Sequence, residues 1–244
     1  GLTSITDSTF YCGGKIQIAD KVIGCWRSVP HGGETLAQGV ANSCNPVFIT
    51  LSQRLGTEKM YKYLEDYGFM GLTGIDYPGE AYAITQPKNT AGPVGLATTS
   101  YGQGIACTPI QLMTALTSLG NGGKMIRPRL VKELRDSDGN VVKTFEPEVI
   151  RQVVSEQTAA DVLVMMEGVV NSGTGTAAYI PGYRIGGKTG TAQKAVNGKY
   201  TDYTYSSFFA LAPIDDPEFA ILVVIDSPKG VHSGSVTAGP GVRA

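Results

Sequence analysis

Hydrophobic residues recur three or four positions apart through much of the first two thirds of the chain. This is the spacing of a helix that buries one face. In one such segment, for example, Phe48, Leu51 and Leu55 fall on the same face. The helices predicted in this way cover residues 36–41, 46–55, 58–67, 109–120 and 156–171.

Residues that favour the first position of a helix precede four of these segments. The predicted N-caps are Asn45, Thr57, Thr108 and Ser155. Asn45 and Thr108 are each followed by a proline, which suits the first helical turn, and Gln111 completes a capping box with Thr108. These signals set the expected helix boundaries.

The remaining hydrophobic segments predict β-structure. Residues 10–27 are expected to form a small hairpin that turns near Ala19-Asp20, and residues 129–145 form another, with Asp138-Gly139 in its turn. Residues 69–107 are rich in loop signals. After the last long helix, strands are predicted at 183–194, 205–213 and 218–226.

The order of helices first and a meandering sheet last predicts an α+β fold, in which helices cover an antiparallel sheet. No linker or internal repeat divides residues 1–244, so one domain is expected. The segment 219–225 is apolar at every position and therefore calls for cover on both faces of its strand.

Composition supports a packed core and excludes some partners. Hydrophobic residues make up 42% of the 244 residues and charged residues 17%, which is typical of globular proteins. The net charge of −1 gives no basic field for a nucleic-acid backbone. No apolar run reaches the length of a bilayer span and no signal peptide opens the chain, so we expect these residues to be soluble.

The cysteines are Cys12, Cys25, Cys44 and Cys107. Their spacings match neither a compact zinc motif nor a redox Cys-x-x-Cys pair. Cys12 and Cys25 flank the expected first hairpin, so the two readings are a cross-hairpin disulfide and two free thiols. The spacing alone does not decide between them.

The string Thr-Gly-Thr-Ala occurs twice, at 174–177 and at 189–192, and only the second copy follows a lysine. The first copy reads as a helix exit. The second lies in a strand directly after Gly186-Gly187, and glycines within a strand often mark the close approach of a ligand. Lys188 with the hydroxyls of Thr189 and Thr191 suits an anionic group such as a carboxylate. The alternative is an edge-strand lysine that only discourages aggregation.

A second polar group is Ser43-Cys44-Asn45, in the break between two predicted helices. Ser43 and Asn45 could direct a hydroxyl and a carboxamide into one cleft. The alternative is ordinary capping, in which Asn45 starts one helix and Ser43 ends the other. The pair gains functional meaning only if it lies beside Lys188.

Ser-x-Asn followed by Lys-Thr-Gly forms two thirds of a motif set known from penicillin-binding proteins and serine β-lactamases. The surrounding segments 35–49, 101–131 and 182–194 resemble class B penicillin-binding proteins in order and context. The resemblance covers essentially the whole chain. It implies a peptidoglycan DD-transpeptidase domain with the penicillin-binding fold, peptidoglycan stem peptides as substrate and β-lactam antibiotics as ligands.

The resemblance also implies a role for each motif residue. Ser43 would relay protons, Asn45 would hold the substrate amide, and Lys188 would supply positive potential. Thr189, Gly190 and Thr191 would form the carboxylate and oxyanion subsite. No metal or organic cofactor is implied. Such proteins act at the extracytoplasmic face of a membrane, to which the intact parent is anchored, and disulfides persist in that compartment. The resemblance therefore favours a Cys12–Cys25 disulfide.

One motif of the family set is missing. None of the serines in residues 1–244 has a lysine three positions later, so the nucleophile motif Ser-x-x-Lys is absent from the sequence. Residues 234–244 resemble the family's last strand, and its closing helix would then be missing as well. We therefore expect a transpeptidase domain truncated at both ends, inactive alone, with a bare sheet face that favours self-association. The alternatives are a β-lactamase or DD-carboxypeptidase, and a non-catalytic β-lactam sensor or interaction domain.

Overall fold

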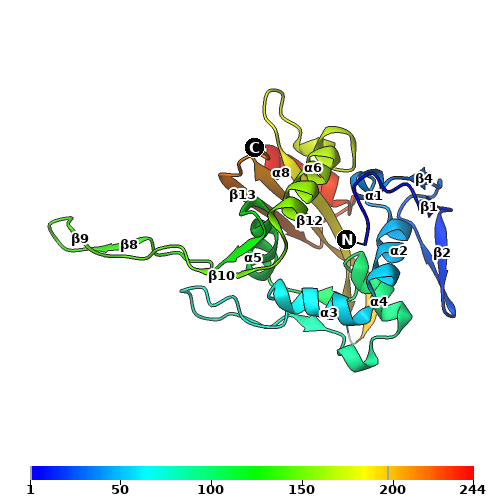
Figure 1. Cartoon of the computed structure of the whole chain (residues 1–244), viewed down its shortest axis with the longest axis horizontal. Coiled ribbons are helices and arrows are strands. Elements are labelled where there is room, and N and C mark those ends of the chain that lie inside the picture. The colour runs from blue at the N-terminus through cyan, green and yellow to red at the C-terminus, as the bar shows by residue number, and fades with distance from the viewer. Residues whose placement is uncertain (1, 197) are drawn as a thin grey trace.

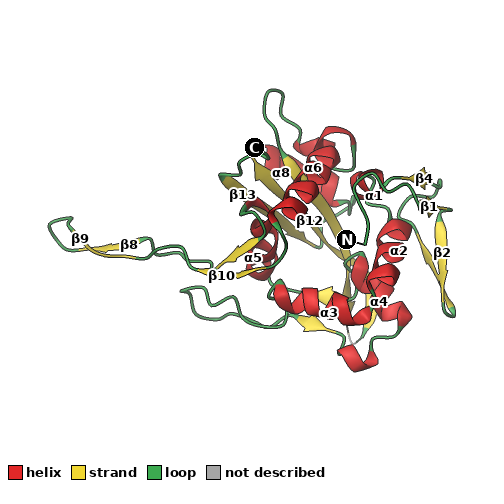
Figure 2. Ribbon diagram, in the orientation of Figure 1, coloured by secondary structure: helices red, strands yellow, loops and turns green. Residues whose placement is uncertain are grey.

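A three-stranded antiparallel sheet forms the centre of the computed structural model, which describes residues 2–196 and 198–244. Its strands are β11 (Gly186–Val196), β12 (Lys199–Ala212) and β13 (Phe219–Asp226), in the order β11-β12-β13. Figure 1 shows α6 (Glu156–Ser172) lying across this sheet, and Figure 2 shows the N-terminal helices grouped on one side of it. The arrangement confirms the predicted α+β class.

The other helices are α1 (Leu36–Ala41), α2 (Asn45–Leu55), α3 (Thr57–Asp66), α4 (Pro93–Ser100), α5 (Pro109–Gly120), α7 (Gly234–Thr237) and α8 (Gly239–Arg243), with short 3-10 turns η1 (Lys88–Thr90) and η2 (Thr176–Ala178). The remaining strands pair two by two: β1 (Phe10–Cys12) with β4 (Gly32–Glu34), β2 (Lys15–Ile18) with β3 (Lys21–Gly24), β5 (Ile84–Thr85) with β6 (Ile105–Ala106), β7 (Lys124–Ile126) with β10 (Val149–Gln152), and β8 (Glu133–Arg135) with β9 (Val141–Thr144).

The two faces of β12 belong to two different cores. Phe209 and Leu211 pack with Leu119 of α5 and Met166 of α6, while Phe208 points to the opposite face. This follows from the period of two along a strand, which sends successive side chains to opposite sides of a sheet. Burying both faces explains the continuous apolar sequence that the strand carries from Phe208 to Ala212.

The second face is covered partly by the end of the chain. The prediction of a last strand at residues 234–244 is wrong, since this segment forms α7 and α8. Val242 of α8 packs against Phe208 and Val223, so the expected bare face is covered along part of its length. Phe219 and Ile221 at the start of β13 remain 64% and 42% exposed.

The helix boundaries follow the predicted caps at two of four positions. Thr108 forms the expected capping box with Gln111, and the Ser155 side chain accepts a hydrogen bond from the amide of Thr158. Asn45 and Thr57 are not N-caps. Each is already inside its helix, and the N-cap positions belong to Cys44 and Gly56, which make no side-chain capping bond.

The N-terminal hairpin is smaller than predicted. The turn at Ala19-Asp20 joins only β2 and β3, whereas Cys12 lies in β1, opposite Gly32 of β4. Cys12 and Cys25 are therefore not cross-strand partners within one hairpin. The expected disulfide between them is not formed in this structure, in which all four cysteines, each within the described residues, are free thiols.

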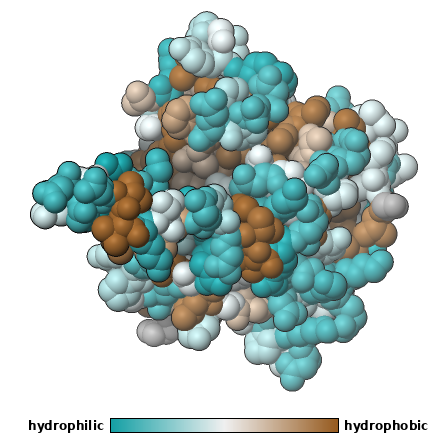
Figure 3. All heavy atoms as spheres, turned by 60° about the vertical axis from the view of Figure 1, so that its left-hand side comes forward, coloured by the Kyte–Doolittle hydropathy of each residue, from teal (hydrophilic) through white to brown (hydrophobic). Residues whose placement is uncertain are grey.

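The hairpin predicted for residues 129–145 is confirmed as β8–β9, and it extends away from the body of the molecule (Figure 1). On the face drawn in Figure 3, hydrophobic residues form small groups separated by hydrophilic ones. Within residues 2–196 and 198–244, no helix combines the length and the apolar composition that are needed to span a bilayer.

Candidate active site

The turn between α1 and α2 holds Ser43 in an unusual backbone conformation. Its φ is +51°, in the left-handed region that residues other than glycine rarely adopt. The amide of Ser43 donates to Val40 O at 3.1 Å and that of Cys44 to Gly39 O at 2.9 Å. These two bonds are those of a Schellman helix end, where glycine normally occupies the left-handed position. A serine here accepts backbone strain, which is a recurrent feature of functional sites.

The strand β11 lies at one edge of the central sheet and carries the Lys-Thr-Gly-Thr segment. Glycine is required here by close packing. A Cβ on Gly187 would lie 2.5 Å from Cε1 of Phe208, and a Cβ on Gly190 would lie 2.5 Å from Oγ of Ser207. The glycines therefore leave room for the Phe208 and Ser207 side chains of β12. Because β11 is an edge strand, part of its backbone is free to pair with an extended peptide.

Lys188 and Ser43, which are 145 residues apart in sequence, are in direct contact. Lys188 Nζ donates a hydrogen bond of 2.7 Å to Ser43 Oγ and one of 3.0 Å to Thr189 O. Desolvation lowers the pKa of the Lys188 ammonium from its ordinary 10.5 to about 8. The lysine can therefore exchange a proton with its surroundings near neutral pH, and the serine hydroxyl lies within reach of that proton.

The doubled Thr-Gly-Thr-Ala string has a structural explanation. Thr174, in the first copy, shares a hydrogen bond of 3.2 Å with the hydroxyl of Thr189 in the second copy. The amide of Thr174 also donates to Ala41 O in α1 at 2.9 Å. The first copy is thus a helix exit, as predicted, and it also links β11 to the end of α1, just before Ser43.

The other predicted residues lie around this contact. The hydroxyl of Thr191 accepts a hydrogen bond of 3.0 Å from the amide of Gly234, at the start of α7. Asn45 Nδ2 donates to Gly24 O at 3.0 Å. Among the described residues, no hydrogen bond joins Asn45 to Lys188. The structure therefore brings Ser43 and Lys188 together, while Asn45 is anchored to the segment that follows β3.

Two supporting residues were not identified from the sequence. Gly234 packs so closely on β11 that a Cβ on it would lie 2.3 Å from Gly190 O and 2.4 Å from Ser207 O. Trp26 Nε1 donates a hydrogen bond of 2.8 Å to Asn42 O, directly before Ser43. A lone tryptophan and a serine-flanked glycine carry no periodic signal, so only the folded arrangement identifies them.

One known protein family matches almost the entire chain. Residues 3–244 match the family described as the penicillin binding protein transpeptidase domain. The chain is 43% identical over 234 residues to stage V sporulation protein D of Bacillus subtilis. That alignment covers 95% of this chain and 36% of the relative. It is 35% identical over 264 residues to a peptidoglycan D,D-transpeptidase FtsI homolog of Mesostigma viride. That alignment covers 96% of this chain and 44% of the relative.

Solved structures show the same fold. Penicillin binding protein 3 of Mycobacterium tuberculosis complexed with ampicillin aligns with a TM-score of 0.89 and 31% identity, over 100% of this chain and 56% of that one. The complex of the same protein with aztreonam aligns with a TM-score of 0.89 and 30% identity. The chain spans less than half the length of the two curated relatives named above.

Proposed function

Since this chain belongs to the penicillin-binding protein transpeptidase family, we propose that it provides most of the substrate cleft of a peptidoglycan DD-transpeptidase. The protein would cross-link stem peptides through an acyl-enzyme and would bind β-lactams in the same cleft. The observation that carries this proposal is the 2.7 Å contact between Lys188 and Ser43, at the edge of a strand that reads Lys-Thr-Gly-Thr. The Mesostigma viride relative, 35% identical, is named a peptidoglycan D,D-transpeptidase, which favours this reaction over the β-lactamase and carboxypeptidase alternatives.

In this proposal the substrate lies between β11 and the turn that contains Ser43. The terminal carboxylate of the stem peptide, or that of a β-lactam, binds the hydroxyls of Thr189 and Thr191 near the Lys188 ammonium. The open backbone of β11 pairs with the peptide main chain. The Thr191 amide, beside Gly190, donates to the oxyanion that forms during acyl transfer.

Ser43 and Lys188 together move protons in this proposal. The nucleophilic serine, which the family supplies from a Ser-x-x-Lys motif, attacks the D-Ala-D-Ala amide, and the departing amine needs a proton. Ser43 donates that proton and is reprotonated from Lys188, whose lowered pKa makes the transfer feasible near neutral pH. Asn45 orients the substrate amide from the start of α2.

We also propose that residues 1–244 alone form no acyl-enzyme, because no Ser-x-x-Lys occurs among them. The intact protein would act at the extracytoplasmic face of the bacterial membrane, where its substrate lies. Exposed Phe219 and Ile221 on β13 would favour self-association of the isolated chain. Sedimentation velocity tests this last point, and a monodisperse monomer at all concentrations would contradict it.

The test of the proposed function is acylation of the full-length protein by a fluorescent penicillin, together with cross-linking of a stem-peptide substrate. Ser43→Ala should reduce both rates by about 100-fold or more, because it removes a proton-transfer group. Ser100→Ala, a serine in α4 with its hydroxyl bonded to Ala97 O, serves as the matched control and should leave both rates unchanged. Equal rates in wild-type and Ser43→Ala proteins would refute the proposed role.

A further inference from the structure

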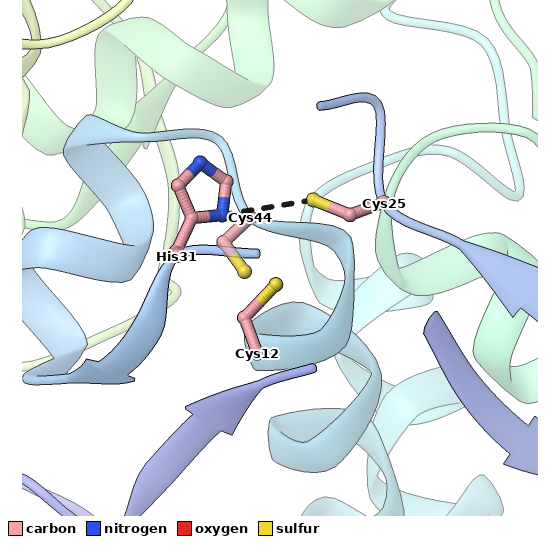
Figure 4. A group of neighbouring side chains, drawn as sticks. All are labelled: Cys12, Cys25, His31 and Cys44. Atoms are coloured by element: carbon pink, nitrogen blue, oxygen red, sulfur yellow. Dashed lines mark hydrogen bonds between the residues drawn. The ribbon is translucent and has the colours of Figure 1, made fainter. Parts of the chain in front are cut away.

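Four side chains beside the candidate active site form a cluster that the proposed reaction does not use. They are Cys12 at the end of β1, Cys25 directly after β3, His31 before β4, and Cys44 at the start of α2. Their ligand atoms all lie within 4.8 Å of one another, and Cys25 Sγ is 3.7 Å from His31 Nδ1. Figure 4 shows the three sulfur atoms and the His31 ring directed towards a common space.

This geometry is close to that of a tetrahedral zinc site. With Zn–S bonds of about 2.3 Å and a Zn–N bond of about 2.0 Å, ligand sulfurs lie about 3.8 Å apart and a sulfur lies about 3.5 Å from the nitrogen. The side chains would therefore need to move only slightly to bind one ion. Cys12 and Cys44 are fully buried, so the ion would be closed off from solvent, as in structural zinc sites.

Glu34 supplies an independent indication of a cation at this place. The residue is 4% exposed, and its Oε2 is buried without a hydrogen-bond partner. The other carboxylate oxygen, Oε1, accepts a bond of 2.8 Å from Asn42 Nδ2, while Oε2 lies 4.0 Å from His31 Nδ1. A buried carboxylate without a partner is costly, and a nearby divalent ion would compensate it. Oε2 lies on the side of Nδ1, the ring nitrogen that faces Cys25, which places the carboxylate charge next to the proposed ion.

We propose that Cys12, Cys25, His31 and Cys44 bind one zinc ion, with Glu34 as the neighbouring carboxylate. Three cysteine thiolates and an imidazole form a ligand set that selects zinc over magnesium or calcium, because thiolates are soft ligands. The site does not depend on the proposed transpeptidase reaction. It makes no use of Lys188 or of any substrate group.

The proposed ion would fix the backbone that carries Ser43. Cys44 is the residue between Ser43 and Asn45, and the segment on the other side of the site is already bonded to the same turn. Asn45 Nδ2 donates to Gly24 O, and Trp26 Nε1 donates to Asn42 O. A metal ion bound by both Cys25 and Cys44 would add coordinate bonds between these two segments. It would therefore hold Ser43 in its left-handed conformation and the hydroxyl towards Lys188.

The first experiment measures metal in the full-length protein, purified under reducing conditions and dialysed against zinc. One equivalent of zinc per chain is expected, and replacement by Co²⁺ should give the intense visible and sulfur charge-transfer absorption of a tetrahedral cobalt thiolate site. Alkylation of the native protein should modify none of the three clustered cysteines until a strong chelator is added. A protein that retains no stoichiometric zinc would overturn the proposal.

Variants locate the metal. Cys25→Ser should weaken zinc binding by at least about 100-fold, and Glu34→Gln by about 10- to 100-fold, measured by competition with a chromophoric chelator. Cys107→Ser is the matched control, since Cys107 lies outside the cluster, and it should bind zinc as the wild type does. If Cys25→Ser fails to fold, the cobalt spectrum of the wild-type protein still shows whether a tetrahedral thiolate site is present.

Two further results would count against the site. Wild-type affinity in a folded Cys25→Ser variant would place the metal elsewhere. Peptide mapping that finds a disulfide between any two of Cys12, Cys25 and Cys44 in protein isolated from cells would show that the thiols are oxidised instead of metal-bound. Absence of that disulfide, with zinc present, is the expected outcome.

Discussion

The buried ammonium of Lys188 should make the protein less stable than a variant without it. In Lys188→Met, a side chain of similar length replaces the lysine and removes the charge. Desolvation lowers the pKa of Lys188 from 10.5 to about 8. Since one pKa unit corresponds to about 1.4 kcal/mol, keeping the protonated form in this place costs roughly 3 kcal/mol. The hydrogen bonds to Ser43 Oγ and Thr189 O offset about 1–2 kcal/mol of this desolvation free energy.

Lys188→Met should therefore raise the free energy of unfolding by about 1–2 kcal/mol at neutral pH. The pH dependence has a definite sign. Between pH 8 and 10.5 the unfolded chain holds a proton on this lysine and the folded protein does not, so wild-type stability rises with pH in that window. The advantage of Lys188→Met is complete below about pH 8 and disappears as pH approaches 10.5.

The assay is guanidinium unfolding followed by circular dichroism, for wild type and variant, below and above this pH window. Lys194→Met on the same strand is the matched control. Its ammonium is bonded to Asp226 at 2.6 Å, which raises the pKa of Lys194, so removing it should not stabilise the protein. A Lys188→Met variant that is less stable than wild type at neutral pH, or a pH-independent difference, would refute the reasoning. The same variant should lose most of its β-lactam acylation in the full-length protein.

Three further predictions concern the same site. At position 43, where φ is +51°, Ser43→Gly should be about 1 kcal/mol more stable than Ser43→Ala in chemical unfolding. Both variants lack the hydroxyl, and only glycine adopts this backbone conformation without strain. Equal stabilities would show that the backbone of Ser43 is not strained. Gly234→Ala should destabilise by more than about 2 kcal/mol because its Cβ would strike backbone oxygens of β11 and β12, whereas Gly168→Ala in α6, with open space around it, should stabilise slightly. Incubation of residues 1–244 with benzylpenicillin should give no added mass in intact-mass spectrometry, and a stoichiometric adduct would show that another serine is the nucleophile.

Local signals in the sequence predicted most of the fold. Thr108 with Gln111, and Ser155, started helices where expected, because the capping bonds involve residues only three positions apart. The segment 93–100 was placed in a loop although it forms α4. Its small residues, in Pro-Val-Gly-Leu-Ala-Thr-Thr-Ser, show little helical periodicity, and the helix is fixed by packing against α2. Tertiary contacts overrode weak local preference there.

The end of the chain was misread for a related reason. Residues 234–244 contain four glycines or prolines and two valines, a composition that suits a strand or turn better than a helix. They form α7 and α8 because Ala238 and Val242 bury against Phe208 on the second face of the sheet. The uncovered apolar face of β12 and β13 dictates this outcome, and it is visible only once the sheet is assembled.

The two clusters at the turn between α1 and α2 differ in how far a sequence could reveal them. Ser43 and Lys188 were paired through known motifs, although no spacing links positions 145 residues apart. The cysteines and His31 lie 13, 6 and 13 residues apart (25 − 12, 31 − 25, 44 − 31), which matches no compact zinc motif. These ligands come from four separate segments, so only folding brings them together. One residue, Cys44, belongs to the Ser-x-Asn motif and to the proposed metal site at once. If zinc binds there, the position of the serine hydroxyl becomes linked to the metal and to the redox state of the thiols, because loss of the ion would release the backbone on which Ser43 is strained.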